Sequence, residues 1–153
     1  MSETPTRATV SRTALFGGLP AEAQAAFAAV GEPRHFSPGS VLMHQGDPSD
    51  SMYVILRGLV RVERVHPAIL DPLLLAELGA GEVAGEMGVL DDEPRTATVT
   101  AITETDTLRI SDADLGGIIL KFPEVSVALL HILSRRLRST DELATQLHES
   151  SDH

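Results

Sequence analysis

Cysteine is absent from this chain of 153 residues. Its absence excludes disulfide bonds, thiolate catalysis and cysteine-bound zinc, and it fits a cytoplasmic protein. Long apolar runs are also missing, since none approaches the ~18 residues that indicate a membrane-spanning helix. The first residues lack the basic and apolar stretches of a secretory signal. We therefore expect a cytoplasmic protein with no membrane partner.

Basic residues are few, since 12 Lys and Arg stand against 22 Asp and Glu, and the formal net charge is −10. Because binding to a phosphate backbone draws mainly on Lys and Arg, this charge disfavours a nucleic-acid partner. Aromatic residues make up only 3% of the chain, yet hydrophobic residues reach 42%. That fraction is enough for a single domain with a real core, which suits the length of the chain.

The N-terminal part of the chain predicts one helix. Residues 1–13 are polar and indicate a flexible N-terminus. An alanine-rich helix is expected over residues 21–30, because Pro20 suits its start and Gly31 and Pro33 stop it. Four apolar residues are expected to pack this region: Leu15, Phe16, Leu19 and Phe27.

Short apolar or alternating runs fill the middle of the chain, about residues 33–110, and turn residues separate them. The runs 52–57 and 59–65 flank Gly58, which predicts two strands around a glycine turn. Further strands are expected at 72–78, 96–104 and 105–111. Strands at this spacing predict a mainly β fold, a jelly roll or small barrel, with N-terminal helices and a long C-terminal helix.

Helical signals return over residues 111–147, where Ser111 is a candidate cap with Asp114 three residues further on. A helix starting at Pro123 carries a heptad-like seam with spacings of 4 and 3: Ser126, Leu130, Leu133, Leu137, Thr140, Ala144 and Leu147. The seam predicts either a helix docked on its own barrel or a homodimer helix over 123–147. A second apolar stripe keeps both interpretations open: Leu129, Ile132 and Leu143.

The segment from Gly85 to Ala101, GEMGVLDDEPRTATVTA, combines glycines, a glutamate and a single arginine. Glycines let the backbone approach a ligand closely, and the start of a short helix after Gly85 would form an anion site. Arg95 offers a planar fork for phosphate oxygens. Glu86 only accepts hydrogen bonds, so it suits a hydroxyl group. Together the two side chains predict a small ligand with a hydroxyl end and an anionic end.

Gly-Glu-Met-Gly followed by Pro-Arg-Thr-Ala resembles the phosphate-binding cassette of the cyclic nucleotide-binding domain family. The segment 15–29 is similar to the helical lead-in of that family, and 36–62 is similar to its early strands. The segment 122–146 resembles the dimer helix of catabolite-activator-type regulators. The resemblance covers about residues 14–147, which leaves 148–153 as a tail.

The resemblance implies a role for each cassette residue. Glu86 would accept the ribose 2′-OH, and Arg95 would pair with the cyclic phosphate. Eight ligand-binding residues are implied: Gly85, Glu86, Met87, Gly88, Arg95, Thr96, Ala97 and Thr140. Thr96 leaves both cAMP and cGMP open as ligands. Asp141, after Thr140, departs from the family's Thr-Ser pair, and Ala84 replaces its usual aromatic residue, so the base contacts also stay open.

The resemblance implies a regulatory protein and not an enzyme, with cAMP or cGMP as its ligand. The chain ends at His153 with no helix-turn-helix, kinase, channel or cyclase segment. We therefore expect a stand-alone sensor that acts through an unknown effector protein or a change of oligomeric state.

Three alternatives are considered beside this interpretation. A cupin-type metal enzyme needs two histidines one residue apart, and the six histidines are scattered: His35, His44, His66, His131, His148 and His153. A fold that has lost its ligand would be a protein–protein adaptor, although Glu86 and Arg95 disfavour it. A different nucleotide, such as a cyclic dinucleotide, is the third alternative.

Overall fold

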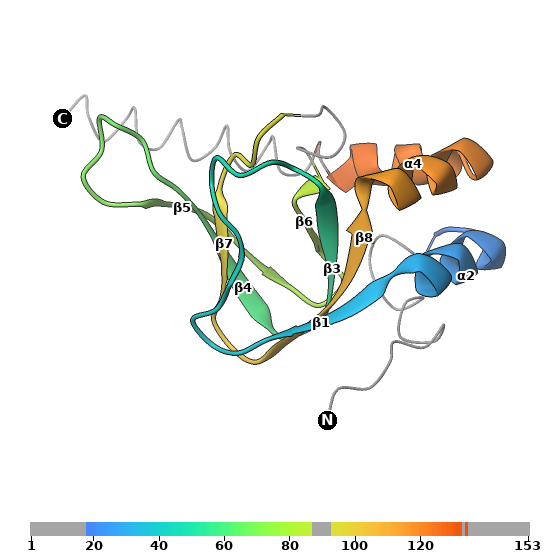
Figure 1. Cartoon of the computed structure of the whole chain (residues 1–153), viewed down its shortest axis with the longest axis horizontal. Helices are drawn as coiled ribbons and strands as arrows, with labels where there is room; N and C mark the ends of the chain where they lie inside the picture. The colour runs from blue at the N-terminus through green and yellow to red at the C-terminus, as the bar shows by residue number, and fades with distance from the viewer. Residues whose placement is uncertain (1–17, 87–92, 133, 135–153) are drawn as a thin grey trace.

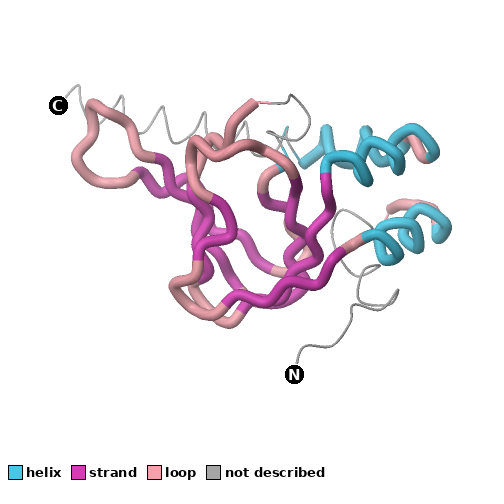
Figure 2. Tube along the Cα trace, in the orientation of Figure 1, coloured by secondary structure: helices cyan, strands magenta, loops and turns pink. Residues whose placement is uncertain are grey.

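The computed structural model describes residues 18–86, 93–132 and 134. Two antiparallel sheets of four strands each form a β-roll with helices on one side (Figure 1). The tube in Figure 2 shows the same arrangement, with the strands gathered in the centre and the helices beside them. The predicted mainly β, jelly-roll fold is confirmed.

The first sheet has the strand order β1-β8-β3-β6. Its strands are β1 (Glu32–Phe36), β3 (Ser51–Arg57), β6 (Val83–Ala84) and β8 (Thr105–Ser111). The second sheet has the order β2-β7-β4-β5. Its strands are β2 (Val41–Met43), β4 (Leu59–Arg64), β5 (Leu73–Gly79) and β7 (Thr98–Ala101). Among these strands, only β4 and β5 are consecutive in the chain and paired, so the roll closes mainly through long-range pairing.

The two strands predicted around a turn at Gly58 are confirmed as β3 and β4, but they do not pair with each other, because β3 belongs to the first sheet and β4 to the second. The φ angle of Gly58 is +108°, which side chains rarely adopt. A Cβ at this position would also lie 2.5 Å from the carbonyl oxygen of Glu104. Glycine is therefore required here by both the backbone angle and the neighbouring chain.

Alternation along the strands divides the core into two clusters. Met52 and Val54 of β3 pack with the helices, while Tyr53 and Ile55 pack inside the roll. The period-2 geometry of a strand sends successive side chains to opposite faces, which explains this division. The helix-side cluster also contains the buried Phe27, as the sequence predicted. Leu15 and Phe16 lie outside the described residues.

Two helices, α2 (Ala21–Val30) and α4 (Asp112–Lys121), lie side by side on the first sheet (Figure 1). The predicted bounds of α2 are confirmed. Ser111 caps α4 as expected, because its side chain accepts a hydrogen bond of 3.1 Å from the Asp114 amide. Among the described residues, no helix is long and apolar enough to cross a membrane.

Residues 124–132 continue as a helix, and two stripes on it differ in burial. Leu129 is 1% exposed and Ile132 is 8% exposed, both in the helix-side cluster. Leu130, on the heptad-like seam, is 58% exposed. Leu129 and Ile132 therefore dock this helix on its own domain, while Leu130 of the seam faces outward and Ser126 is half-buried. The rest of the seam, from Leu133 on, lies outside the described residues, so the homodimer stays a prediction.

Candidate functional site

A cavity of about 300 Å³ opens on the β-roll beside Arg95. Two acidic and two basic residues line it together with apolar ones: Leu42, Met43, Asp47, Pro48, Asp50, Tyr53, Arg95 and Arg109. They come from β2, β3, β8, the β2–β3 loop and the segment before β7. The site therefore depends on the closure of the roll and not on one stretch of sequence.

The backbone around Arg95 is tied to the loop between β2 and β3. The Arg95 amide donates to the carbonyl of Asp47 at 2.8 Å, and the Arg95 carbonyl accepts from the Gly46 amide at 2.8 Å. The turn at Gly46 and Asp47 thus forms backbone hydrogen bonds with the cassette. These two bonds fix the position from which the Arg95 side chain enters the cavity.

The guanidinium of Arg95 is held inside the protein, with only 4% of its side chain exposed. Its Nη1 donates to the Gly85 carbonyl at 3.2 Å, and its Nη2 donates to Ser51 Oγ at 3.3 Å. Nη2 also lies 3.5 Å from Asp50 Oδ1. The contact with Asp50 is long for a bond between two charged groups, which is usually about 2.7–2.9 Å. The described contacts therefore hold the guanidinium in place, and its N–H groups can still donate shorter hydrogen bonds to an anion.

Burial lowers the pKa of Arg95, and the negative charge of Asp50 opposes this effect. The positive charge of Arg109 acts in the same direction as burial. Arginine keeps its proton in proteins, so the cost of burial is expressed as attraction for an anion rather than as loss of charge. An anionic group that entered the cavity would relieve that cost.

Gly85 makes the close approach of the cassette to Arg95 possible. Its φ angle is +86°, and an added Cβ would lie 2.5 Å from Arg95 Nη1 and 2.9 Å from the terminal methyl of Met43. The predicted need for glycine at this position thus has a specific cause. Glu86 follows as a helical residue and is fully buried, at 0% exposed. A carboxylate is very rarely buried to this extent unless it has a partner.

The structure brings together some of the residues predicted to bind ligand. Gly85 and Arg95 are in contact, Ala97 is buried at 7% exposed, and Thr96 is exposed. Three predicted residues lie outside the described residues: Met87, Gly88 and Thr140. Their roles stay predictions.

Two charged residues of the cavity were not predicted from the sequence. Asp50 stands in a turn-rich loop, and Arg109 stands in a strand of alternating residues. A charged residue in a loop or on an alternating strand is usually a solvent-exposed surface residue. Nothing in the sequence therefore separates Asp50 or Arg109 from such surface residues. Only the pairing of β3 with β8 places Arg109 opposite Tyr53 and beside Asp50.

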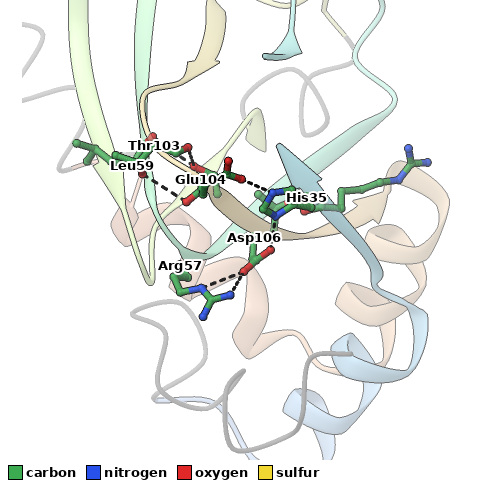
Figure 3. Close-up of polar contacts among 9 residues, drawn as sticks. His35, Arg57, Leu59, Thr103, Glu104 and Asp106 are labelled. Carbon is green, nitrogen blue, oxygen red and sulfur yellow. Dashed lines mark hydrogen bonds and ion pairs between the residues drawn. The ribbon is translucent and has the colours of Figure 1, made fainter. Parts of the chain in front are cut away.

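A second polar cluster lies where β1 pairs with β8 (Figure 3). His35 bridges two carboxylates, with Nδ1 2.7 Å from Asp106 and Nε2 2.5 Å from Glu104. Arg57 donates to the other oxygen of Asp106 at 3.0 Å and 2.5 Å. Hydrogen bonds to Asp106, and then to Glu104, raise the pKa of His35. None of these residues lines the cavity.

Metal ligation finds no support in the part of the chain that the structure describes. Among residues 18–86, 93–132 and 134, no group of three or more His, Asp or Glu side chains is arranged to hold an ion. The described histidines therefore give no support to a cupin-type metal enzyme.

Comparison with known proteins identifies the family to which this fold belongs. Residues 33–122 match the family described as the cyclic nucleotide-binding domain. The chain belongs to this family. The match contains both Gly85 and Arg95, so the residues in contact at the cavity are part of the family's own region.

Individual relatives of this cyclic nucleotide-binding domain are regulators. The CRP-like cAMP-activated global transcriptional regulator of Mycobacterium tuberculosis is 33% identical over 132 residues, which are 86% of this chain and 58% of that protein. The catabolite activator protein of Thermus thermophilus gives a TM-score of 0.78 at 32% identity, covering 89% of this chain and 63% of that chain. The N-terminal domain of a transcriptional regulator from Streptomyces coelicolor gives 0.67 at 37% identity, covering 88% and 93%.

The chain spans 58% of the length of the curated regulators it matches. The match therefore establishes the regulatory cyclic nucleotide-binding fold of this chain. It does not establish that this chain has the activity of the whole regulators.

Proposed function

We propose that this domain binds a cyclic mononucleotide, cAMP or cGMP, at the cavity beside Arg95 and acts as a regulatory sensor. The observation that carries the proposal is the buried guanidinium of Arg95, which lines a cavity of about 300 Å³ and lies 3.2–3.5 Å from its described partners Gly85, Ser51 and Asp50. A cyclic phosphate is an anion that could replace those contacts with shorter, charge-assisted hydrogen bonds. The name of the Mycobacterium tuberculosis relative supports cAMP as the first ligand to test.

Glu86 complements Arg95 in this proposal. Its carboxylate would accept the ribose 2′-OH, because an ionised carboxylate accepts hydrogen bonds and donates none. Its burial supports a structured role, since a surface charge would contribute little to recognition. Gly85, which contacts Arg95 and precedes Glu86 in the chain, would let the backbone approach the sugar and phosphate.

The output of binding would pass to a partner protein or to a change of oligomeric state. Binding shifts a conformational equilibrium only when the ligand contacts differ between the two states. The cassette joins β6 to β7 and is tied to the β2–β3 loop through Arg95, so contacts at the phosphate would bias two connected segments. The relatives support a regulatory role without enzymatic activity of this domain. The absence of a nucleic-acid partner stays a prediction.

Calorimetric titration of nucleotide-stripped protein with cAMP and cGMP tests the proposal. Arg95→Ala should lose about 2–5 kcal/mol of binding free energy, because it removes one partner of a buried charged contact. Arg64→Ala, at an exposed position on β4, is the matched control and should bind like the wild type. Circular dichroism of each variant establishes that it is folded.

Two results would contradict the proposal. Equal affinity in wild type and Arg95→Ala would show that the cavity is not the phosphate site. Folded wild-type protein that binds neither nucleotide would favour the adaptor or a different nucleotide, and titration with a cyclic dinucleotide would separate these two.

A further inference from the structure

Arg109 is a second arginine in the cavity and lies outside the cassette. It stands on β8, opposite Tyr53 of β3 and Glu32 of β1. Tyr53 packs inside the roll, and Arg109 lines the same cavity. Its side chain is 23% exposed, so most of this charged group is removed from water. A charge in this position calls for a partner, because burying an unpaired charge is costly.

The partners that the protein provides for Arg109 are incomplete. Within the described part of the chain, its guanidinium makes two ion pairs, each at 3.6 Å, with Glu32 Oε2 and Asp50 Oδ2. Neither distance is short enough for a hydrogen bond. A guanidinium carries five N–H donors, so the described residues leave its donor capacity largely unused. Because Arg109 lines the cavity, these donors are available to a ligand that enters it.

Asp50 shows what kind of group fits between the two arginines. Its Oδ1 lies 3.5 Å from Nη2 of Arg95, and its Oδ2 lies 3.6 Å from Nη2 of Arg109. The guanidinium groups are thus spaced so that one anion with two oxygens reaches both. A cyclic phosphodiester presents such a pair in its two exocyclic oxygens. The Asp50 side chain is 68% exposed, so it can give way to an entering ligand at little cost.

We propose that Arg109 is a second phosphate-binding residue, which contacts one exocyclic oxygen of a cyclic phosphodiester while Arg95 contacts the other. This inference rests on the proposed function and adds a residue to it. Glu32 forms an ion pair with the Arg109 guanidinium through its Nη1, at 3.6 Å.

The first test compares the affinities of wild type, Arg109→Gln and Arg109→Lys for cAMP and cGMP by calorimetry. Arg109→Gln should weaken binding of the nucleotide that the wild type binds by about ten- to a hundredfold, the loss expected for a hydrogen bond between charged groups. Arg109→Lys should recover part of the affinity, because it keeps the charge without the planar fork. Arg64→Gln removes the same charge from an exposed position on β4 and should change nothing.

The second test separates a direct contact from a structural effect. The two phosphorothioate diastereomers of the bound nucleotide carry sulfur in place of one or the other exocyclic oxygen. Wild-type protein should bind both more weakly than the parent, because sulfur is a poorer acceptor at either position. Arg109→Gln should lose its sensitivity to one diastereomer and keep its sensitivity to the other. If Arg109→Gln unfolds at a lower temperature than the wild type, the same comparison is made with Arg109→Lys.

The outcomes distinguish this inference from the proposed function. Wild-type protein that binds neither nucleotide overturns the proposed function and this inference with it. Wild-type binding that Arg109→Gln leaves unchanged overturns the inference alone. Binding that weakens with equal sensitivity to both diastereomers also overturns it, because the arginine then acts only on the fold.

Discussion

Gly85 and Arg95 stand ten positions apart in the chain and are in direct contact in the fold. Arg95 Nη1 donates a 3.2 Å hydrogen bond to the Gly85 carbonyl, and a Cβ on Gly85 would lie 2.5 Å from that same nitrogen. The glycine thus sets both the backbone direction at the start of the cassette and the space into which the arginine reaches. The two residues form one structural unit of the candidate site.

Gly85→Ala is expected to weaken cyclic nucleotide binding and to destabilise the fold. The positive φ angle should cost about 1–3 kcal/mol of unfolding free energy, and Arg95 must also move. Gly39→Ala is the matched control, because Gly39 has a φ angle of +87° but no atom within 4 Å of its Cβ position. Urea unfolding should show a loss in both variants, while calorimetry should show weaker binding only for Gly85→Ala. Equal affinity of the two variants would contradict the role given to Gly85.

Glu86→Gln should reduce affinity by about 1.5–3 kcal/mol, the value of a hydrogen bond to a charged group. The effect should depend on the ribose hydroxyl. Wild-type protein should prefer cAMP over 2′-deoxy-cAMP, and the variant should bind the two with nearly equal affinity. Glu124→Gln, an exposed position, serves as the control. A variant that keeps the full preference for cAMP would rule out Glu86 as the ribose contact.

Two neighbouring leucines should respond differently to substitution. Leu129→Ala should lower the unfolding free energy by about 2–5 kcal/mol, because Leu129 is buried and its truncation leaves a cavity. Leu130→Glu, at a side chain 58% exposed, should leave the fold intact. If the seam joins two copies, sedimentation should then show monomers for Leu130→Glu and dimers for the wild type. Identical sedimentation of the two proteins would show that Leu130 is not part of a dimer contact.

The His35 cluster should make stability depend on pH. The pKa of His35 is raised above its ordinary value of 6.5, so its contribution is fully present below that value and is lost as pH rises through the folded pKa. Burial would raise the pKa of Asp106, but hydrogen bonds from His35 and Arg57 outweigh it and lower that pKa. His35→Gln should therefore destabilise the protein more at about pH 6 than at about pH 9.

Thermal unfolding of the wild type and His35→Gln at several pH values checks this prediction. His44→Gln is the control, because His44 is exposed and its side chain makes no hydrogen bond or ion pair with the described residues. A difference between wild type and His35→Gln that stays constant with pH would exclude the ion pairs of Figure 3 as its source.

Local signals were enough to predict much of the fold. The helix at 21–30, the turn at Gly58 and the Ser111 cap are each decided by a few adjacent residues, and the structure confirms all three. The β-roll was predicted at about 33–110, and its strands run from Glu32 to Ser111. Each of these features follows from short-range sterics, capping or alternation, which a sequence displays directly.

The residues of the candidate site likewise fall into those that the sequence predicted and those that it did not. Its cassette could be predicted, because Gly85, Glu86 and Arg95 lie within one short segment whose chemistry is explicit. Asp50 and Arg109 could not be predicted, because Asp50 pairs with Arg95, 45 positions away in the chain, and with Arg109, 59 positions away. A charged residue in a loop or on a strand is ordinarily exposed to solvent, and the sequence holds no sign to the contrary.

The sequence by itself determined the helix at 21–30, most of the longer strands, the turn at Gly58 and the glutamate and arginine of the cassette, since these depend on backbone geometry and side-chain chemistry within a few residues. The tertiary structure decided which charges share the cavity, which leucine of the helix is buried and how His35 meets two carboxylates. The physical reason is that strand pairing brings distant residues together. β8 lies between β1 and β3 in the first sheet, and that position places Arg109 between Glu32 and Asp50.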